Sequence, residues 1–268
     1  MNKFKISQIQ FQAKPSPQEN AVLLESFFIK AQKYKPDLIC TPECSNLITN
    51  DRKHLFSYAT YQADCPVINK AKIFAKKNKV NINLGSLLLK VKNSKKLVNR
   101  SILINAGGKI QSSYDKIHLF DVNISPSENH KESQSFVKGK ELIISKINGV
   151  KIGLTICYDL RFPDLYRQLA KKGAKIILIP SAFTVPTGKA HWETLVRARS
   201  IENSIFVIAT NMCGNHHTNR KTYGHSILCD PWGNIKNKAL SRSKILNTSI
   251  DLNQITRVRL KIPSIYYG

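Results

Sequence analysis

The chain has 268 residues, of which 42 are Lys or Arg and 17 are Asp or Glu, so its formal net charge is +25 at pH 7. A hydrophobic fraction of 42% excludes wholesale disorder, and no apolar run approaches the roughly 20 residues of a membrane span. A chain of this length can bury a full core, and no linker divides it, so we expect one domain over residues 1–268.

In the first half of the chain, short apolar strands alternate with amphipathic helices. Ser16 followed by Pro17 and, three residues on, Glu19 is typical of a capped helix start. The apolar residues around the lysine-rich run 70–79 recur at helical spacing, which predicts a helix with a solvated lysine face. The expected strands are 5–12, 37–40, 80–89, 97–105 and 109–114, and the first expected helix is 17–34.

The second half continues the alternation after an irregular stretch. Residues 117–139 show no clear periodicity and are expected to form a long loop of functional or mobile character. The expected strands are 151–157, 175–179, 205–211, 225–229, 235–239 and 246–250, and the expected helices are 163–172 and 190–203. Trp192 and Trp232 are expected in the core. This order predicts an α/β domain with mixed sheets.

The positive charge leaves two interpretations open. One is an anionic partner such as nucleic acid, and the other is composition bias, because 32 of the 42 basic residues are Lys and Ile and Asn are also abundant. The lysines are scattered, and aromatic residues are not interleaved with them as in single-strand binders. We therefore favour composition bias and expect neither a nucleic-acid nor a membrane partner.

The cysteines and histidines give no pattern typical of a disulfide framework or a metal site. Cys40 and Cys44 lack a second Cys/His pair, and the adjacent His216 and His217 have poor chelating geometry. The N-terminal residues 1–7 lack the apolar region of a secretory signal. We expect reduced thiols, a cytoplasmic location and no metal.

Polar residues follow several predicted strands at their carboxyl ends, where ligands bind in open α/β folds. Glu43, Lys116 and Cys157 supply a carboxylate, an ammonium and a thiol at three such ends. This is a set that can support covalent catalysis, but a buried cysteine is more often inert, and spacing alone leaves both options open. No Gly-x-Cys-x-Gly elbow, phosphate-binding loop or dinucleotide fingerprint is present.

The same three segments resemble the Glu, Lys and Cys blocks of the carbon–nitrogen hydrolase (nitrilase) superfamily. They read Thr-Pro-Glu-Cys at 41–44, Tyr-Asp-Lys-Ile-His-Leu-Phe-Asp at 114–121 and Gly-Leu-Thr-Ile-Cys-Tyr-Asp-Leu-Arg-Phe-Pro at 153–163. Further similar blocks lie at 180–183, 191–193, 197–203, 230–233 and 250–252. The resemblance thus extends over nearly the whole chain.

This resemblance implies a four-layer α-β-β-α sandwich that usually dimerises, and an amidase that needs no metal or organic cofactor. It implies Cys157 as nucleophile, Glu43 as general base and Lys116 as the cation beside the oxyanion. Glu132 matches a second family glutamate, with Glu128 as a nearby alternative.

Other residues are candidates for substrate contacts. The backbone N–H of Tyr158 could help hold the oxyanion, and Phe183 could line the pocket. Arg161 is either a ligand for a substrate carboxylate or a structural residue. His118, His191 and His225 are expected to be scaffold residues.

Segments 213–217 and 223–226 most resemble the branch of the family that hydrolyses deaminated glutathione. Such an enzyme would release α-ketoglutarate and cysteinylglycine and serve metabolite repair. One alternative is an ω-amidase acting on α-ketoglutaramate or another small aliphatic amide. A more remote one is a basic nucleic-acid-binding protein on an inactive scaffold.

Overall fold

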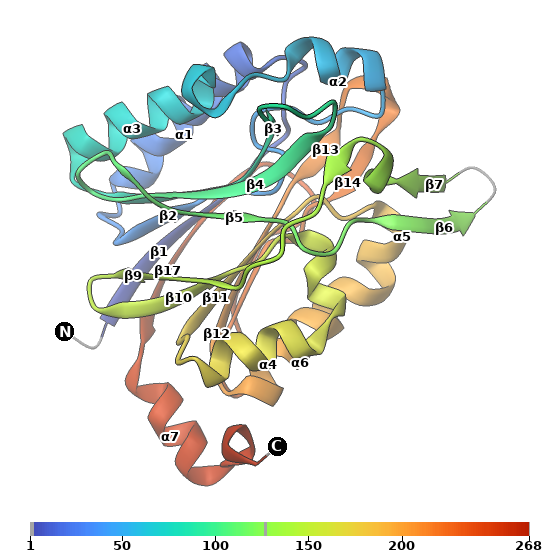
Figure 1. The fold of residues 1–268 in the computed structure, drawn as a ribbon. Helices are drawn as coiled ribbons and strands as arrows, with labels where there is room; N and C mark the ends of the chain where they lie inside the picture. The colour runs from blue at the N-terminus through green and yellow to red at the C-terminus, as the bar shows by residue number, and fades with distance from the viewer. Residues whose placement is uncertain (1–2, 126–127, 268) are drawn as a thin grey trace.

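Two β-sheets stack face to face, and helices cover the outer side of each (Figure 1). The computed structural model describes residues 3–125 and 128–267. The first sheet has the strand order β17-β1-β2-β3-β4-β5, with β8 paired to β4, and the second has the order β16-β15-β12-β11-β10-β9. The expected α-β-β-α sandwich is confirmed.

The first sheet is parallel at its centre and antiparallel toward both edges. β1 pairs in parallel with β2, and β2 with β3, whereas β17, β4 and β5 join antiparallel. Its strands are β1 (Lys3–Gln10), β2 (Leu38–Cys40), β3 (Asn81–Lys90), β4 (Leu97–Ile104), β5 (Ile110–Asp115), β8 (Phe136–Val137) and β17 (Lys244–Asp251). The predicted hairpin turn between β4 and β5 closes with Gly108 at φ 77°.

The second sheet also has a parallel centre, formed by β10, β11 and β12. Its strands are β9 (Ile143–Ile147), β10 (Val150–Leu154), β11 (Ile176–Ser181), β12 (Phe206–Asn211), β15 (Ile227–Cys229) and β16 (Ile235–Lys238). Side chains from both sheets, among them Phe4, Ile6, Ile152 and Ile208, share one buried cluster. The inner faces of the sheets therefore form a common core.

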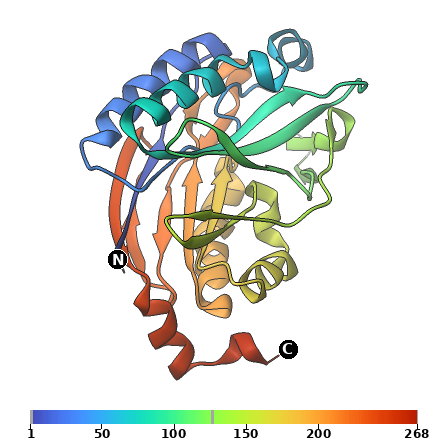
Figure 2. The same ribbon diagram turned by 60° about the vertical axis from the view of Figure 1, so that its left-hand side comes forward.

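The helices lie in two outer layers (Figure 2). α1 (Pro17–Gln32) and α3 (Pro66–Asn78) cover the first sheet, while α4 (Pro163–Lys171) and α6 (Glu193–Asn203) cover the second. The Ser16 hydroxyl accepts a hydrogen bond from the Glu19 backbone N–H at 3.3 Å, so the predicted cap is confirmed. α3 buries the predicted apolar residues Val67, Ile68, Ala71, Phe74 and Ala75.

Several elements differ from the sequence expectations. The segment 117–139 contains a hairpin of β6 (Asp121–Ser125) and β7 (Glu128–Lys131) and the strand β8, where we expected a loop. α2 (Arg52–Tyr58), α5 (Val185–Thr187), β9, the hairpin of β13 (Cys213–Asn215) and β14 (Lys221–Tyr223), and α7 (Asn253–Lys261) were not predicted. Trp192 is buried as expected, but Trp232 is 49% exposed because it lies on the surface turn between β15 and β16.

The helices of the described residues include none that is long and apolar enough to cross a membrane. Within the same residues, no group of His, Cys, Asp and Glu side chains is arranged to hold a metal ion.

Candidate active site

Glu43 follows β2 and is buried against side chains from both sheets. Its Oε1 accepts hydrogen bonds from Lys116 Nζ at 3.0 Å and from Asn99 Nδ2 at 2.9 Å. Its Oε2 accepts the backbone N–H of Ala182, directly after β11, at 2.9 Å. The Cys157 thiol also hydrogen-bonds to this carboxylate. Glu43 therefore connects the two sheets at the ends of their parallel strands.

Lys116 follows β5, and its side chain is only 2% exposed. Its ammonium lies between two carboxylates, at 3.0 Å from Glu43 Oε1 and at 2.9 Å from Glu132 Oε2. Burial lowers the pKa of Lys116, but the charges of Glu132 and Glu43 outweigh this and raise the pKa well above its usual value. The lysine is held as an ammonium.

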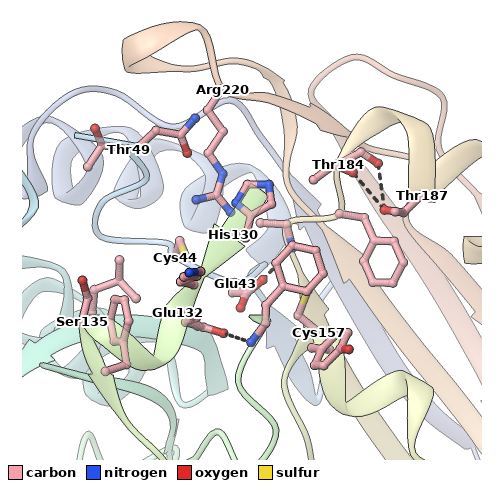
Figure 3. Close-up of a pocket in the computed structure, with 18 of the residues that line it drawn as sticks. Glu43, Cys44, Thr49, His130, Glu132, Ser135, Cys157, Thr184, Thr187 and Arg220 are labelled. Carbon is pink, nitrogen blue, oxygen red and sulfur yellow. Dashed lines mark hydrogen bonds between the residues drawn. The ribbon is translucent and has the colours of Figure 1, made fainter. Parts of the chain in front are cut away.

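Glu132, one of the two glutamates of segment 117–139, contacts this cluster (Figure 3). Its Oε2 accepts the Phe120 backbone N–H at 2.6 Å, and its Oε1 accepts a hydrogen bond from Asn99 Nδ2 at 3.2 Å. Glu128 begins β7, and its side chain lies outside what the structure describes.

Asn99 was not among the predicted site residues. Its Nδ2 donates to both carboxylates, so it fixes Glu43 and Glu132 relative to each other. It lies within β4 next to the polar residues Arg100 and Ser101, so its polarity alone gives no reason to single it out.

Cys157 begins a short 3-10 helix, Cys157–Arg161, that follows β10. Its φ of 47° is uncommon for a residue other than glycine and produces a sharp turn without flanking glycines. The buried carboxylate of Asp159 holds this turn by accepting the Ile156 backbone N–H at 2.8 Å. Asp159 also accepts hydrogen bonds from Tyr114 OH at 2.7 Å and from the His118 backbone N–H at 3.0 Å.

The protonation states of the thiol and the carboxylate follow from their surroundings. Burial and the Glu43 charge raise the pKa of Cys157 well above its usual value, although Lys116 opposes this. Burial also acts to raise the pKa of Glu43, but the Lys116 charge and the hydrogen bonds from Cys157 and Lys116 bring the pKa below its usual value. The resting pair is therefore a neutral thiol beside an ionised carboxylate.

These side chains open into a cavity of about 620 Å³. Its lining includes Glu43, Lys116, Glu132 and Cys157 from the cluster. It also includes the three predicted substrate contacts Tyr158, Arg161 and Phe183. The structure thus brings together all seven residues singled out from the sequence.

Tyr158 and Phe183 flank Arg161 in the cavity. The Arg161 guanidinium lies 5.9 Å from the Tyr158 ring centroid and 5.7 Å from that of Phe183. One of its nitrogens also lies 3.3 Å from His191 Nδ1. The Tyr158 backbone N–H lies in the first turn of the 3-10 helix, where N–H groups have no acceptor within the helix.

The histidines expected to be scaffold residues are engaged with the protein. His118 Nδ1 lies 2.7 Å from Asp159 Oδ1, and its ring stacks on Phe162. His225 Nδ1 lies 2.7 Å from the Tyr223 carbonyl oxygen.

A four-layer α-β-β-α sandwich with a buried cysteine, glutamate and lysine at one end of its sheets defines the nitrilase-like class of proteins. Residues 5–260 match the carbon–nitrogen hydrolase family. The chain belongs to this family and is a hydrolase acting on carbon–nitrogen bonds other than peptide bonds.

Three relatives illustrate the similarity. The deaminated glutathione amidase of Dictyostelium discoideum is 36% identical over 98% of this chain and 93% of its own length. The deaminated glutathione amidase of Synechocystis is 32% identical over 100% of this chain and 98% of its own length. The crystal structure of the Caenorhabditis elegans NitFhit protein has a TM-score of 0.93 at 32% identity and covers 100% of this chain, which spans 65% of that longer protein.

Proposed function

We propose that the protein hydrolyses the amide bond of deaminated glutathione through a thioester on Cys157 and releases α-ketoglutarate and cysteinylglycine. The relatives named deaminated glutathione amidase, which align over nearly the whole chain, support the substrate. The observation that carries the mechanism is the neutral Cys157 thiol hydrogen-bonded to the Glu43 carboxylate beside the buried Lys116 ammonium.

In the first step, Glu43 removes the thiol proton as the Cys157 sulfur attacks the amide carbon. The carbonyl oxygen becomes an oxyanion, which the Lys116 ammonium and the Tyr158 backbone N–H stabilise. One such donor is typically worth about 2.7–4 kcal/mol in the transition state. Glu132 acts through Lys116, because its carboxylate fixes the position of that ammonium.

In the second step, the protonated Glu43 gives its proton to the leaving amine as the carbon–nitrogen bond breaks, and a thioester remains on Cys157. Glu43 then removes a proton from water, which attacks the thioester carbon. The carbon–sulfur bond breaks, Glu43 returns the proton to the Cys157 sulfur, and the carboxylic acid leaves. On this route the substrate and one water supply every atom of the products.

Arg161 is proposed to bind the carboxylate next to the keto group, on the acyl side of the substrate. Its guanidinium lines the cavity close to Tyr158, which directly follows the nucleophile. The Phe183 ring also lies beside the guanidinium, with its centroid 5.7 Å away.

The test of the mechanism is intact-mass spectrometry of purified protein mixed with deaminated glutathione and quenched in acid. We expect an α-ketoglutaryl adduct on Cys157 and no adduct or turnover with Cys157→Ala. Amide hydrolysis by Cys157→Ala would overturn the mechanism.

The substrate is tested by comparing kcat/KM for deaminated glutathione, α-ketoglutaramate and a simple aliphatic amide, and equal values would overturn the substrate assignment.

We further propose that residues 1–268 act as one cytoplasmic domain that forms a homodimer and binds no nucleic acid. α6 contacts the C-terminal turn Ser264–Tyr266, and Ile201 on α6 and Tyr266 are exposed apolar side chains that a second copy could cover. Light scattering at several protein concentrations tests the dimer, and a monomer at all of them would overturn it. A salt titration tests the expected absence of nucleic-acid binding, and binding with a steep salt dependence would contradict it.

A further inference from the structure

Arg220 places an unpartnered guanidinium in the active-site cavity (Figure 3). Within residues 3–125 and 128–267, its side chain makes no hydrogen bond or ion pair, and its Nε is buried. The other two arginines of the cavity each have a partner, since Arg52 donates to Ser135 Oγ and Arg161 lies beside His191. A guanidinium presents five N–H donors, so an unpartnered one directed into a cavity favours an anionic ligand.

The carboxylates that line the cavity do not neutralise Arg220. Glu43 and Glu132 accept hydrogen bonds from Lys116 and Asn99. Asp51 caps α2 by accepting two backbone N–H groups. Besides Lys116, the cavity is lined by five cationic side chains, Arg52, Lys131, Arg161, Arg220 and Lys221. The cavity wall around Arg220 thus has an excess of positive charge, which an anionic group of the substrate can neutralise.

The backbone at Arg220 is fixed by the hairpin of β13 and β14. The Arg220 carbonyl oxygen accepts the His216 N–H at 2.8 Å across the hairpin. The tip is anchored to the segment before α2, because the Asn50 N–H donates to Thr218 Oγ1 at 3.1 Å. A guanidinium on a fixed backbone loses less freedom when it binds a ligand than one on a mobile loop.

The position of Arg220 near Glu43 indicates which part of the substrate it contacts. Arg220 and Glu43 both line this cavity (Figure 3), and the Arg220 charge acts to lower the pKa of Glu43. The proposed mechanism needs Glu43 next to the leaving nitrogen, because Glu43 protonates it. Deaminated glutathione has one carboxylate on the acyl side of its scissile amide and a second at the glycine end of the leaving group.

We infer that Arg220 binds the carboxylate of the leaving group and thereby selects amides with an anion on both sides of the scissile bond. This inference rests on the proposed function and makes it more specific, since α-ketoglutaramate has only the acyl-side carboxylate. A substrate whose leaving group is ammonia has no carboxylate there for Arg220 to bind.

The experiment compares deaminated glutathione with its counterpart whose glycine carboxylate is capped as a carboxamide. We expect the wild type to prefer the free acid, and Arg220→Gln to lose about 10- to 100-fold in kcat/KM for it, as for a hydrogen bond between charged groups. Turnover of the capped compound and of α-ketoglutaramate should change less than about threefold. Arg220→Lys, which keeps the charge but loses the planar fork, should fall in between.

Arg242→Gln is the matched control, because it removes the same charge from an exposed position outside the cavity. It should leave all three activities unchanged. An equal loss on free acid and capped compound in Arg220→Gln would overturn the Arg220 assignment and leave the proposed function intact.

Binding separates the two proposals further, with calorimetric Kd values for both compounds on the Cys157→Ala background. If the free acid binds better and this preference disappears with Arg220→Gln, the carboxylate site is supported. If the protein with Cys157 intact nevertheless does not hydrolyse the free acid, the proposed substrate is overturned. If neither compound binds, both the Arg220 assignment and the proposed substrate are overturned.

Discussion

The Cys157 thiol lies where its own ionisation is unfavourable. It is buried and faces the Glu43 carboxylate, and both effects raise the pKa of the thiol. The proton has an acceptor in Glu43, whose own pKa is lowered. The proposed nucleophile therefore forms only together with proton transfer, as a carbonyl carbon comes within reach.

This arrangement predicts a flat pH profile. Because the Glu43 pKa is lowered, the base stays ionised at neutral pH, and activity is lost only as pH falls below the usual carboxyl pKa of about 4.3. Because the Cys157 pKa is raised, kcat/KM should not change between about pH 6 and pH 9. Measuring kcat/KM in constant-ionic-strength buffers checks this, and a rise through the usual thiol range of about pH 8–9 would contradict it.

Asp159 is predicted to be needed for both stability and activity. Replacing it with Asn puts an NH₂ group or a weaker acceptor against the donors of Ile156, His118 and Tyr114. We expect Asp159→Asn to lower the free energy of unfolding by about 2–4 kcal/mol and to reduce kcat, because the Cys157 turn loses its anchor. Urea denaturation and steady-state kinetics measure the two effects.

Tyr114→Phe is the control for Asp159→Asn, since it removes the hydroxyl that donates to Asp159 and accepts the Ile117 N–H, and leaves the carboxylate in place. It should cost about 1–2 kcal/mol of stability. An Asp159→Asn protein as stable and as active as the wild type would show that this network is dispensable.

At the residue scale, the candidate site could be predicted because its residues lie in short contiguous sequence motifs. Glu43, Lys116 and Cys157 each follow a predicted strand, and the structure places them in contact. Asn99 and Arg220 were not found, since an asparagine inside a strand and an arginine in a polar hairpin have no distinctive neighbours. Trp232 was misplaced because its size suggested burial, whereas the turn around Asp230 holds it at the surface.

At the scale of elements, the two sheets approach each other closely at Gly85 of β3. A Cβ built there would lie 1.9 Å from the Thr41 carbonyl oxygen and 2.5 Å from Pro180 Cβ. These neighbours precede Glu43 and Ala182, which are joined by a hydrogen bond in the site. The bare backbone of Gly85 therefore allows the two site segments to meet.

Gly85→Ala is predicted to destabilise the protein by about 1–3 kcal/mol or more and to reduce activity strongly, because the Glu43 segment must shift. Gly107→Ala provides the comparison, since its Cβ would meet only the Asn105 side chain at 3.2 Å. Thermal unfolding and kcat should show the contrast. Equal behaviour of the two variants would mean that the close approach at Gly85 does not matter.

The predicted elements were most accurate where one face is buried. α1 and α3 bury their apolar stripes, and the central strands β11 and β12 are mostly apolar and buried throughout. The hairpin of β6 and β7 was missed because its strands carry mostly polar side chains and do not belong to either main sheet. α7 was missed because it buries only Ile255 and Val258.

At the scale of the whole molecule, the net charge of +25 is predicted to speed the encounter with an anionic substrate. We expect kcat/KM for a dianionic amide to fall roughly two- to tenfold between low and about 0.5 M salt, because screening weakens long-range attraction. An uncharged aliphatic amide measured in parallel should be insensitive. Equal salt effects on both substrates would show that the charge plays no part in substrate encounter.

Glu43 and Lys116 are attached to one sheet, and Cys157 and Ala182 to the other. Neither sheet alone contains the hydrogen-bonded cluster, so the cluster exists only after the two layers have docked. During refolding, secondary structure can form earlier because helices and hairpins need only local contacts. Recovery of activity therefore reports the late docking of the layers, and a partly folded chain has no premature hydrolytic activity.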